Sequence, residues 1–203
     1  MKKVVFICSH LYSGSDALYE SMNLHQKIQG FKSYKGNIYE SPLHLLRLCE
    51  NIHKINNRSA VYLDNLVYNY QISTKSVYDY CKFIYVLTKP EHVINSLISI
   101  EKKKVSHAIN YYNFRLRRIC EMAKRTPGAI FLTFEDMAQG KGMNLISDYL
   151  ELREPVEFNP LYLAPFQKTF STDLLGSVLR SQVEDTYERY LYFLKNQLLL
   201  RPQ

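Results

Sequence analysis

The sequence has 203 residues, 46% hydrophobic and 22% charged, which is enough for one well-buried core and too little for two comfortable domains. Its formal net charge of +7 favours an anionic partner without identifying it. No run approaches the ~20 consecutive apolar residues of a membrane span, and the start MKKVVFICSH lacks the features of a signal peptide, so we expect a cytoplasmic protein without a transmembrane segment.

Short apolar runs rich in β-branched and aromatic residues predict strands at 3–8, 60–63, 83–87 and 129–133. None of these runs alternates between polar and apolar residues. We therefore expect each strand to be buried on both faces, as the strands of a parallel sheet are.

Helical patterns separate these strands. The first helix begins near Asp16, a second opens at Pro42, a third follows the strand at 83–87, and a long one covers 106–125. A further helix is expected near 142–150. The apolar positions that mark the first helix are Ala17, Leu18, Met22 and Ile28, and those of a final helix are Val183, Tyr187, Leu191, Leu194 and Leu198.

Strands that alternate with helices predict an α/β fold, a three-layer sandwich with a central parallel sheet flanked by helices. We expect residues 1–203 to form one domain, with a core at 3–150 and a helical C-terminal part at 151–203. The apolar stripe of the final helix indicates core packing, with a partner-binding face as the alternative.

The cysteines are far apart and form no CxxC pair, and no histidine stands at metal-ligand spacing, so we expect free thiols in a reducing compartment and no metal site. They are Cys8, Cys49, Cys81 and Cys120. The densest positive region combines 102–104 with Arg115, Arg117 and Arg118, and a solvated helix face explains it without a ligand. Stacking aromatics between the basic residues and a nucleic-acid-binding module are both missing, so no nucleic-acid partner is expected.

The stretch 9–15, which supplies small serine and glycine residues, joins the first strand to the first helix. Small residues allow successive backbone N–H groups to converge on one point, and the helix adds its free N–H groups and the positive end of its dipole. Such a cradle binds an anion without needing any one side chain. A simple strand-to-helix turn is the alternative interpretation.

The stretch CSHLYSGSDAL resembles the 5′-phosphosulfate loop of the sulfotransferases that use 3′-phosphoadenosine 5′-phosphosulfate (PAPS). Ser13, Gly14 and Ser15 match the family pattern, whereas Tyr12 takes the position of a basic residue and Asp16 that of a hydroxyl residue. The resemblance implies that the 5′-phosphosulfate lies over Ser9, His10, Tyr12, Ser13, Gly14, Ser15 and Asp16. As alternatives, His10 and Tyr12 pack within the loop, and Asp16 complements the helix dipole or caps the helix.

A second stretch, FIYVLTKPEHVINSLIS, is similar to the family segment that binds the 3′-phosphate through an arginine at a strand end and a serine in the next helix. Ser96 matches the serine, while Thr88 stands where arginine is expected and Lys89 where aspartate is. The resemblance implies that these three residues lie near the 3′-phosphate, with Lys89 or the lysines at 102–104 supplying the charge.

The resemblance also suggests where a general base would lie. YLDNLVYNY places Asp64 about where cytosolic-type members carry a catalytic histidine, and NIYESPLHLL places Glu40 where protein-tyrosine-type members carry a catalytic glutamate. FLTFEDM is similar to the family's late strand and acidic pair. Glu40 and Asp64 are the candidates for catalysis, with His44 or another group left open, and a capping or surface role is the alternative for each carboxylate.

Taken together, these resemblances imply an atypical sulfotransferase, whose α/β fold would be of the P-loop-containing nucleotide-binding type. It would use PAPS, leave 3′-phosphoadenosine 5′-phosphate (PAP) as the product, require no metal, and sulfate an unknown hydroxyl or amine acceptor, carbohydrates included. The loss of two basic positions supports an alternative: a non-catalytic relative that binds a nucleotide, a sulfated glycan or a protein partner. A P-loop kinase or NTPase fits poorly, because the loop lacks G-x-x-x-x-G-K-S/T.

Overall fold

The computed structural model describes residues 3–30, 38–55, 61–72, 74–163, 177–197 and 200–202. The strands are β1 (Lys3–Cys8), β2 (Ile28–Gly30), β3 (Val61–Leu66), β4 (Cys81–Leu87) and β5 (Ile130–Thr133). The helices are α1 (Ser15–Asn23), α2 (Pro42–Ile55), α3 (Pro90–Ser99), α4 (Val105–Ala123), α5 (Phe134–Ala138), α6 (Met143–Leu150) and α8 (Ser177–Asn196), with short 3-10 helices η2 (Lys75–Tyr80) and η3 (Pro160–Leu163).

The strands form one parallel sheet in the order β2-β3-β1-β4-β5. From β1 the chain moves outward to β2, returns to β3 beside β1, and then crosses to β4 on the other side of β1. This reversal makes the carboxyl end of β1 a topological switch point, which is where open α/β sheets bind their ligands. The predicted α/β sandwich with a central parallel sheet is confirmed, and the loop of interest leaves β1 at this point.

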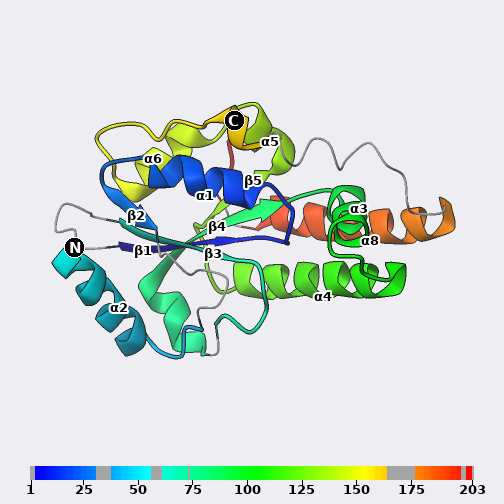
Figure 1. Cartoon of the computed structure of the whole chain (residues 1–203), viewed down its shortest axis with the longest axis horizontal. Helices are drawn as coiled ribbons and strands as arrows, with labels where there is room; N and C mark the ends of the chain where they lie inside the picture. Colours follow the sequence, from blue (N-terminus) through cyan, green and yellow to red (C-terminus); the bar gives the residue numbers. More distant parts are fainter. Residues whose placement is uncertain are drawn as a thin grey trace.

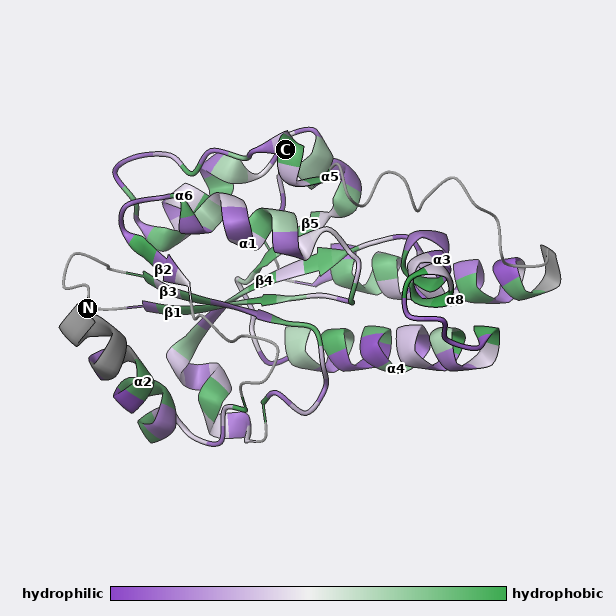
Figure 2. Ribbon diagram, viewed as in Figure 1, coloured by the Kyte–Doolittle hydropathy of each residue, from purple (hydrophilic) through white to green (hydrophobic). Residues whose placement is uncertain are grey.

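Helices cover both faces of the sheet. In Figure 1, α1 and α6 lie above the strands and α2 and α4 below them, with α8 running alongside α4. Alternate residues of β1 enter two different cores: Val5 and Ile7 face α1, whereas Phe6 and Cys8 face the side of α4. Figure 2 shows the matching pattern, with mainly apolar strands and helices striped with apolar and polar residues.

The prediction of a first helix that includes Ile28 is wrong. Helix α1 ends at Asn23, a turn follows, and Ile28 opens the edge strand β2. Gly30 is the last residue of β2 and lies against Tyr19, where a Cβ atom would be 2.1 Å from the Tyr19 hydroxyl. A three-residue strand is too short to give a periodic pattern, so the sequence offered no signal for it.

The other expected strands and helices are present, with small shifts in their ends. Strand β3 extends beyond 60–63 to include Asp64 and Asn65, which are completely buried. Their side chains are hydrogen-bonded inside the protein, which permits polar residues in a strand buried on both faces.

The final helix packs on the core as predicted. Its stripe residues Val183, Tyr187, Leu191 and Leu194 are buried, while Leu198 lies outside the described residues. Cys8, Cys81 and Cys120 are free thiols, and the side chain of Cys49 is outside the described part. Within the described ranges, no helix combines the length and apolar character that crossing a bilayer requires.

Candidate functional site

The loop after β1 has the backbone geometry of an anion cradle. Tyr12 and Gly14 have positive φ angles of 58° and 79°, and Ser13 between them does not. Such alternation turns successive N–H groups toward one point. The N–H groups of Tyr12, Ser13 and Gly14 find no acceptor in the described part of the chain, and Gly14 is also the N-cap of α1.

Gly14 is packed against aromatic and aliphatic side chains on the side where other residues carry Cβ. A Cβ atom at Gly14 would lie 2.8 Å from the Phe134 ring and 3.3 Å from Leu163. The positive φ and the close approach together require glycine here. Phe134 opens α5 directly after β5, so two strand ends meet at this loop.

A chain of polar contacts fixes the start of α1 against the sheet. The Ser9 hydroxyl donates to the Ser15 hydroxyl at 2.6 Å, and the Asn65 amide donates to the Ser15 hydroxyl at 3.0 Å and to the Asp16 carboxylate at 2.9 Å. Asp16 therefore has a hydrogen-bonded partner on β3. Its charge remains in the first turn of α1, where it complements the helix dipole and opposes a bound anion.

Helix α4 holds the loop from the opposite side. The Tyr111 hydroxyl accepts from the Leu11 N–H at 2.8 Å and donates to the Val67 carbonyl at 2.9 Å. The Arg115 guanidinium donates to the Ser9 carbonyl at 2.8 Å, and also to the carbonyl of Leu66 and the side chain of Asn69. These contacts connect the ends of β1 and β3 through a single helix.

His10 is completely buried, and its ring stacks on Tyr112 with ring centroids 4.3 Å apart. Its Nε2 lies 3.1 Å from the Tyr112 carbonyl, so Nε2 carries the proton and donates. Burial lowers the pKa of His10 to about 3, with the nearby Arg115 charge acting in the same direction. The structure therefore places His10 in the loop as a neutral packing residue beneath the cradle.

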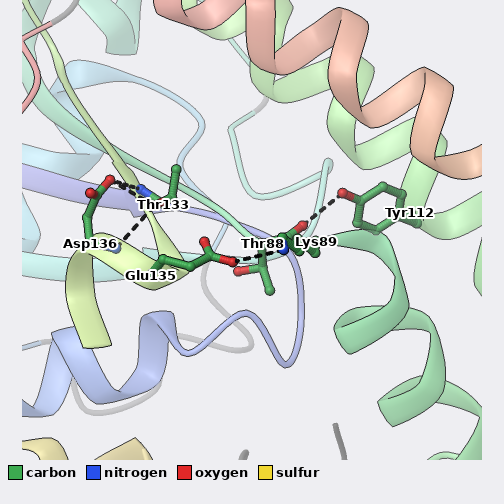
Figure 3. A network of polar contacts seen from close by, with 6 residues as sticks. All are labelled: Thr88, Lys89, Tyr112, Thr133, Glu135 and Asp136. Atoms are coloured by element: carbon green, nitrogen blue, oxygen red, sulfur yellow. Dashed lines mark hydrogen bonds and ion pairs between the residues drawn. The ribbon is translucent and has the colours of Figure 1, made fainter. Parts of the chain in front are cut away.

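Thr88 and Lys89 lie at the end of β4 beside the loop (Figure 3). The fully buried Thr88 hydroxyl donates to the Ser13 carbonyl at 2.8 Å, and the Tyr112 hydroxyl donates to the Thr88 carbonyl at 2.8 Å. Lys89 is half exposed and its ammonium lies 3.9 Å from the Glu135 carboxylate. Thr88 thus supports the loop, and Lys89 is the cation at this strand end.

Ser96 is buried on α3, where its hydroxyl donates to the His92 carbonyl at 2.8 Å. This bond lies within one turn of α3. It can be exchanged for a ligand only if the side chain rotates. The geometry leaves the predicted contact of Ser96 with a 3′-phosphate untested.

The two carboxylates expected to act as bases lie in different environments. Asp64 is completely buried, accepts from the Tyr39 hydroxyl and accepts from the Asn65 N–H at 2.8 Å. Glu40 is exposed next to Tyr39, and its backbone carbonyl accepts from Thr74 at 2.9 Å. Asp64 would need a local rearrangement to touch an acceptor, whereas Glu40 is already accessible.

A cavity of about 310 Å³ adjoins the loop on the side of α3 and α4. Its lining residues are Leu11, Tyr68, Leu97, Glu101, Lys103, His107, Ala108 and Tyr111. The Tyr12 hydroxyl donates to the Glu101 carboxylate at 2.5 Å, so this carboxylate joins the loop to the cavity. Burial and the Glu101 contact raise the pKa of Tyr12, which keeps its hydroxyl protonated and able to donate.

Sequence reasoning missed the part played by Glu101, Tyr111, Tyr112 and Arg115. The prediction of a solvated helix face is wrong for Arg115, which is 1% exposed. A signal was present, because Arg115 stands three residues after Tyr112 and four before Ile119, on the apolar stripe of α4. An arginine on such a stripe needs buried acceptors, and only strand or loop ends offer free carbonyl groups there.

Comparisons with known proteins support the fold. No protein-family model matches the sequence, and no curated protein matches it. A sulfotransferase from Alicyclobacillus acidocaldarius has a similar structure, with a TM-score of 0.60 and 12% identity over 96% of this chain and 95% of that one. This likeness shows that the chain has the sulfotransferase fold.

Two further structures are similar at lower scores. Mouse sulfotransferase SULT7A1 complexed with PAP gives a TM-score of 0.49 and 16% identity over 84% of this chain and 65% of that one. Retinol dehydratase in a complex with retinol and PAP gives a TM-score of 0.47 and 12% identity over 100% and 84% of the two chains.

Replacing Gly14 with alanine should destabilise the protein more than the same change at Gly128. Both glycines have φ near 79°, but nothing lies within 4 Å of a Cβ atom built at Gly128. Gly128→Ala should lower the free energy of unfolding by ~1 kcal/mol from backbone strain alone, and Gly14→Ala by ~3 kcal/mol because of the added overlap. Urea unfolding measures the loss of free energy of unfolding in both variants. Equal losses would show that the side chains of Phe134 and Leu163 move away from the added methyl group at no cost.

The low pKa of His10 predicts a pH-dependent contribution to stability. Its pKa falls from 6.5 to about 3 on folding, so unfolding takes up a proton between these values. The stability due to neutral His10 is therefore complete above about pH 6.5 and is lost as the pH falls toward 3. The stability gap between wild type and His10→Gln should shrink by ~2 kcal/mol from pH 6.5 to 5, measured by denaturant titration. A gap that stays constant would contradict the assignment.

Proposed function

We propose that this protein binds PAPS at residues 9–16 and transfers its sulfuryl group to a hydroxyl or amine acceptor. One observation carries the proposal: the unbonded N–H groups of Tyr12, Ser13 and Gly14 lie at the start of α1 and at the switch point of a sulfotransferase fold. Backbone amides and a helix N-terminus bind phosphate and sulfate groups without a cationic side chain.

The residues at the loop fit the 5′ end of the donor better than the 3′ end. The amides would hold the phosphosulfate, with Ser15 fixing the first turn of α1. At the 3′ end, Thr88 and Ser96 already bind carbonyl groups, which leaves Lys89 as the cation for a phosphate. When bound, PAPS supplies a sulfuryl group whose departure leaves negative charge on a phosphate oxygen.

The acceptor would occupy the cavity beside the loop. Leu97, Tyr68 and Tyr111 offer apolar and aromatic surface, and Lys103 adds a positive charge at the wall. This composition favours a small aromatic or amphipathic acceptor over an extended polymer, because the volume is about 310 Å³. Tyr68 also stacks on Tyr70 with centroids 5.3 Å apart, which widens the aromatic surface at the rim.

Glu101 is the base that this arrangement favours. It lines the cavity, and its contact with Tyr12 places it at the loop where the sulfuryl group would lie. A base must come within hydrogen-bond reach of the acceptor proton. Glu40 and Asp64 do not line this cavity, so their catalytic role remains a prediction. His107 lines it and is the other candidate base there.

A non-catalytic function is the second candidate, and a specific observation favours it. The ends of β1 and β4 bind each other through Thr88 and Ser13, while Phe134 covers Gly14. The Ser13 carbonyl and one side of Gly14 are then occupied by the protein itself, although the N–H groups of Tyr12, Ser13 and Gly14 find no acceptor among the described residues. In that case the fold would serve to bind another nucleotide, a sulfated glycan or a protein partner.

PAP should stabilise the protein against thermal unfolding if the loop binds the donor. A ligand at 100 times its dissociation constant adds ~2.7 kcal/mol to the free energy of unfolding. Differential scanning fluorimetry with PAP, and with ATP as the comparison, measures this shift. No shift at millimolar PAP would favour the non-catalytic function.

A matched pair of variants tests where PAP binds. Tyr12→Arg restores a basic residue at the loop and should tighten PAP binding by about tenfold, the effect of one close charge near the surface. Tyr80→Arg adds the same charge at an exposed site before β4, at the opposite end of the sheet from the loop, and should change the affinity less than about twofold. Equal effects would mean that PAP responds only to net charge.

Glu101→Gln should reduce turnover while leaving donor affinity intact. The amide keeps an oxygen for the Tyr12 hydroxyl but cannot accept the acceptor proton, so kcat should fall by ~10²- to 10⁴-fold. The assay follows sulfuryl transfer from labelled PAPS to a panel of phenols, amines and sugars, with PAP affinity measured in parallel. His107→Gln is the control; a loss in that variant alone would reassign the base.

A further inference from the structure

We infer that Arg115 is an internal cation for the anion site: a buried guanidinium beneath the loop that supplies the positive charge missing at Tyr12. The inference rests on the proposed function, since it assigns the charge that would hold the donor's anionic group. Arg115 is a positioning residue, because it acts through the loop and does not itself touch the ligand.

The first support is its place in the fold. Arg115 is 1% exposed and donates to groups at the carboxyl ends of both β1 and β3, on either side of the switch point. One of its acceptors is the carbonyl of Ser9, the residue whose hydroxyl binds Ser15 at the start of α1. A single residue, Ser9, therefore links the guanidinium to Ser15, the first residue of α1.

The second support is that the charge has no counter-ion among the described residues. The acceptors of Arg115 are two backbone carbonyls and the neutral amide of Asn69, and none of the ion pairs found in the described ranges includes it. Asp64 on the same side of the sheet is bonded to Tyr39 and to the Asn65 N–H. A buried cation is costly unless it is paired, so an anion that comes close to it gains a strong attraction.

The neighbouring groups respond to this charge and do not neutralise it. Burial raises the pKa of the Cys8 thiol to about 12, so this thiol stays neutral although Arg115 acts to lower its pKa. Burial lowers the pKa of His10 to about 3, and Arg115 adds to the effect, so the imidazole in the loop is neutral as well. Tyr111 stays protonated, since burial raises its pKa to about 12. The charge of Arg115 therefore acts on the His10 side chain, inside the loop.

The sharpest test gives Arg115 a counter-ion and leaves the shape of the neighbouring side chain at position 69 almost unchanged. The Asn69 Oδ1 atom lies 3.0 Å from an Arg115 nitrogen, so Asn69→Asp would convert a neutral hydrogen bond into an ion pair. Isothermal titration with PAP should show about tenfold weaker binding than wild type, while the thermal midpoint without ligand stays the same or rises. A purely structural arginine would gain stability from the new pair and leave PAP affinity unchanged.

Asn110→Asp is the matched control. Asn110 is an exposed residue of α4, the helix that carries Arg115, and the substitution adds the same charge as Asn69→Asp. It should weaken PAP binding less than about twofold. If Asn110→Asp and Asn69→Asp weaken binding equally, net charge explains the effect and the inference is wrong.

A second pair guards against loss of structure. Arg115→Lys keeps the charge and Arg115→Gln removes it, and both lose the forked geometry that binds two strand ends. Lysine should retain PAP affinity within about threefold, whereas glutamine should lose about tenfold at a comparable thermal midpoint. If wild type binds PAP and the two variants bind it equally well, the inference is wrong and the proposed function stands. If wild type does not bind PAP, both the inference and the proposed function are wrong.

Discussion

The contact between the Arg115 guanidinium and the ends of β1 and β3 is the constraint on which the site depends. The last carbonyl groups of parallel strands need partners from outside the strands. At a switch point, the segments that leave two neighbouring strands also run in opposite directions. A single planar cation with several donors binds the carbonyls of Ser9 and Leu66 at once, and the Leu66 carbonyl also accepts from the Ser9 N–H at 3.1 Å. It thereby fixes the point from which the loop and α1 depart.

This arrangement puts the basic group of the site inside the protein. A surface lysine or arginine in the loop is screened by water and salt, whereas a charge among packed side chains acts through a medium of lower dielectric constant. The loop itself is then free to carry residues that pack, such as Tyr12 with its positive φ and its bond to Glu101. Apparent loss of charge from a motif is therefore no measure of the electrostatic potential at the motif.

The sequence was sufficient for the sheet and the place of the loop, because strands buried on both faces and the Ser-Gly turn leave local signals. It was insufficient for β2, which has three residues, and for the direction of side chains such as Thr88 and His10. Whether the Thr88 hydroxyl or the His10 imidazole faces a ligand or a neighbouring carbonyl depends on contacts with residues that are distant in the sequence. The position of charge failed for a different reason. Arg115 stands on the apolar stripe of α4 and is buried, whereas Arg118 is part of a surface pair, and treating the basic residues as one cluster hid this difference.

The hydrogen bond from Tyr12 to Glu101 has a consequence for how two substrates would share the site. The phenol can give its proton to one partner at a time. An acceptor that engages the carboxylate of Glu101 would displace the phenol, which could then turn to the oxygen from which sulfur departs. Binding of the acceptor would in this way free the Tyr12 hydroxyl for the donor. The donor would then react only after the acceptor has bound.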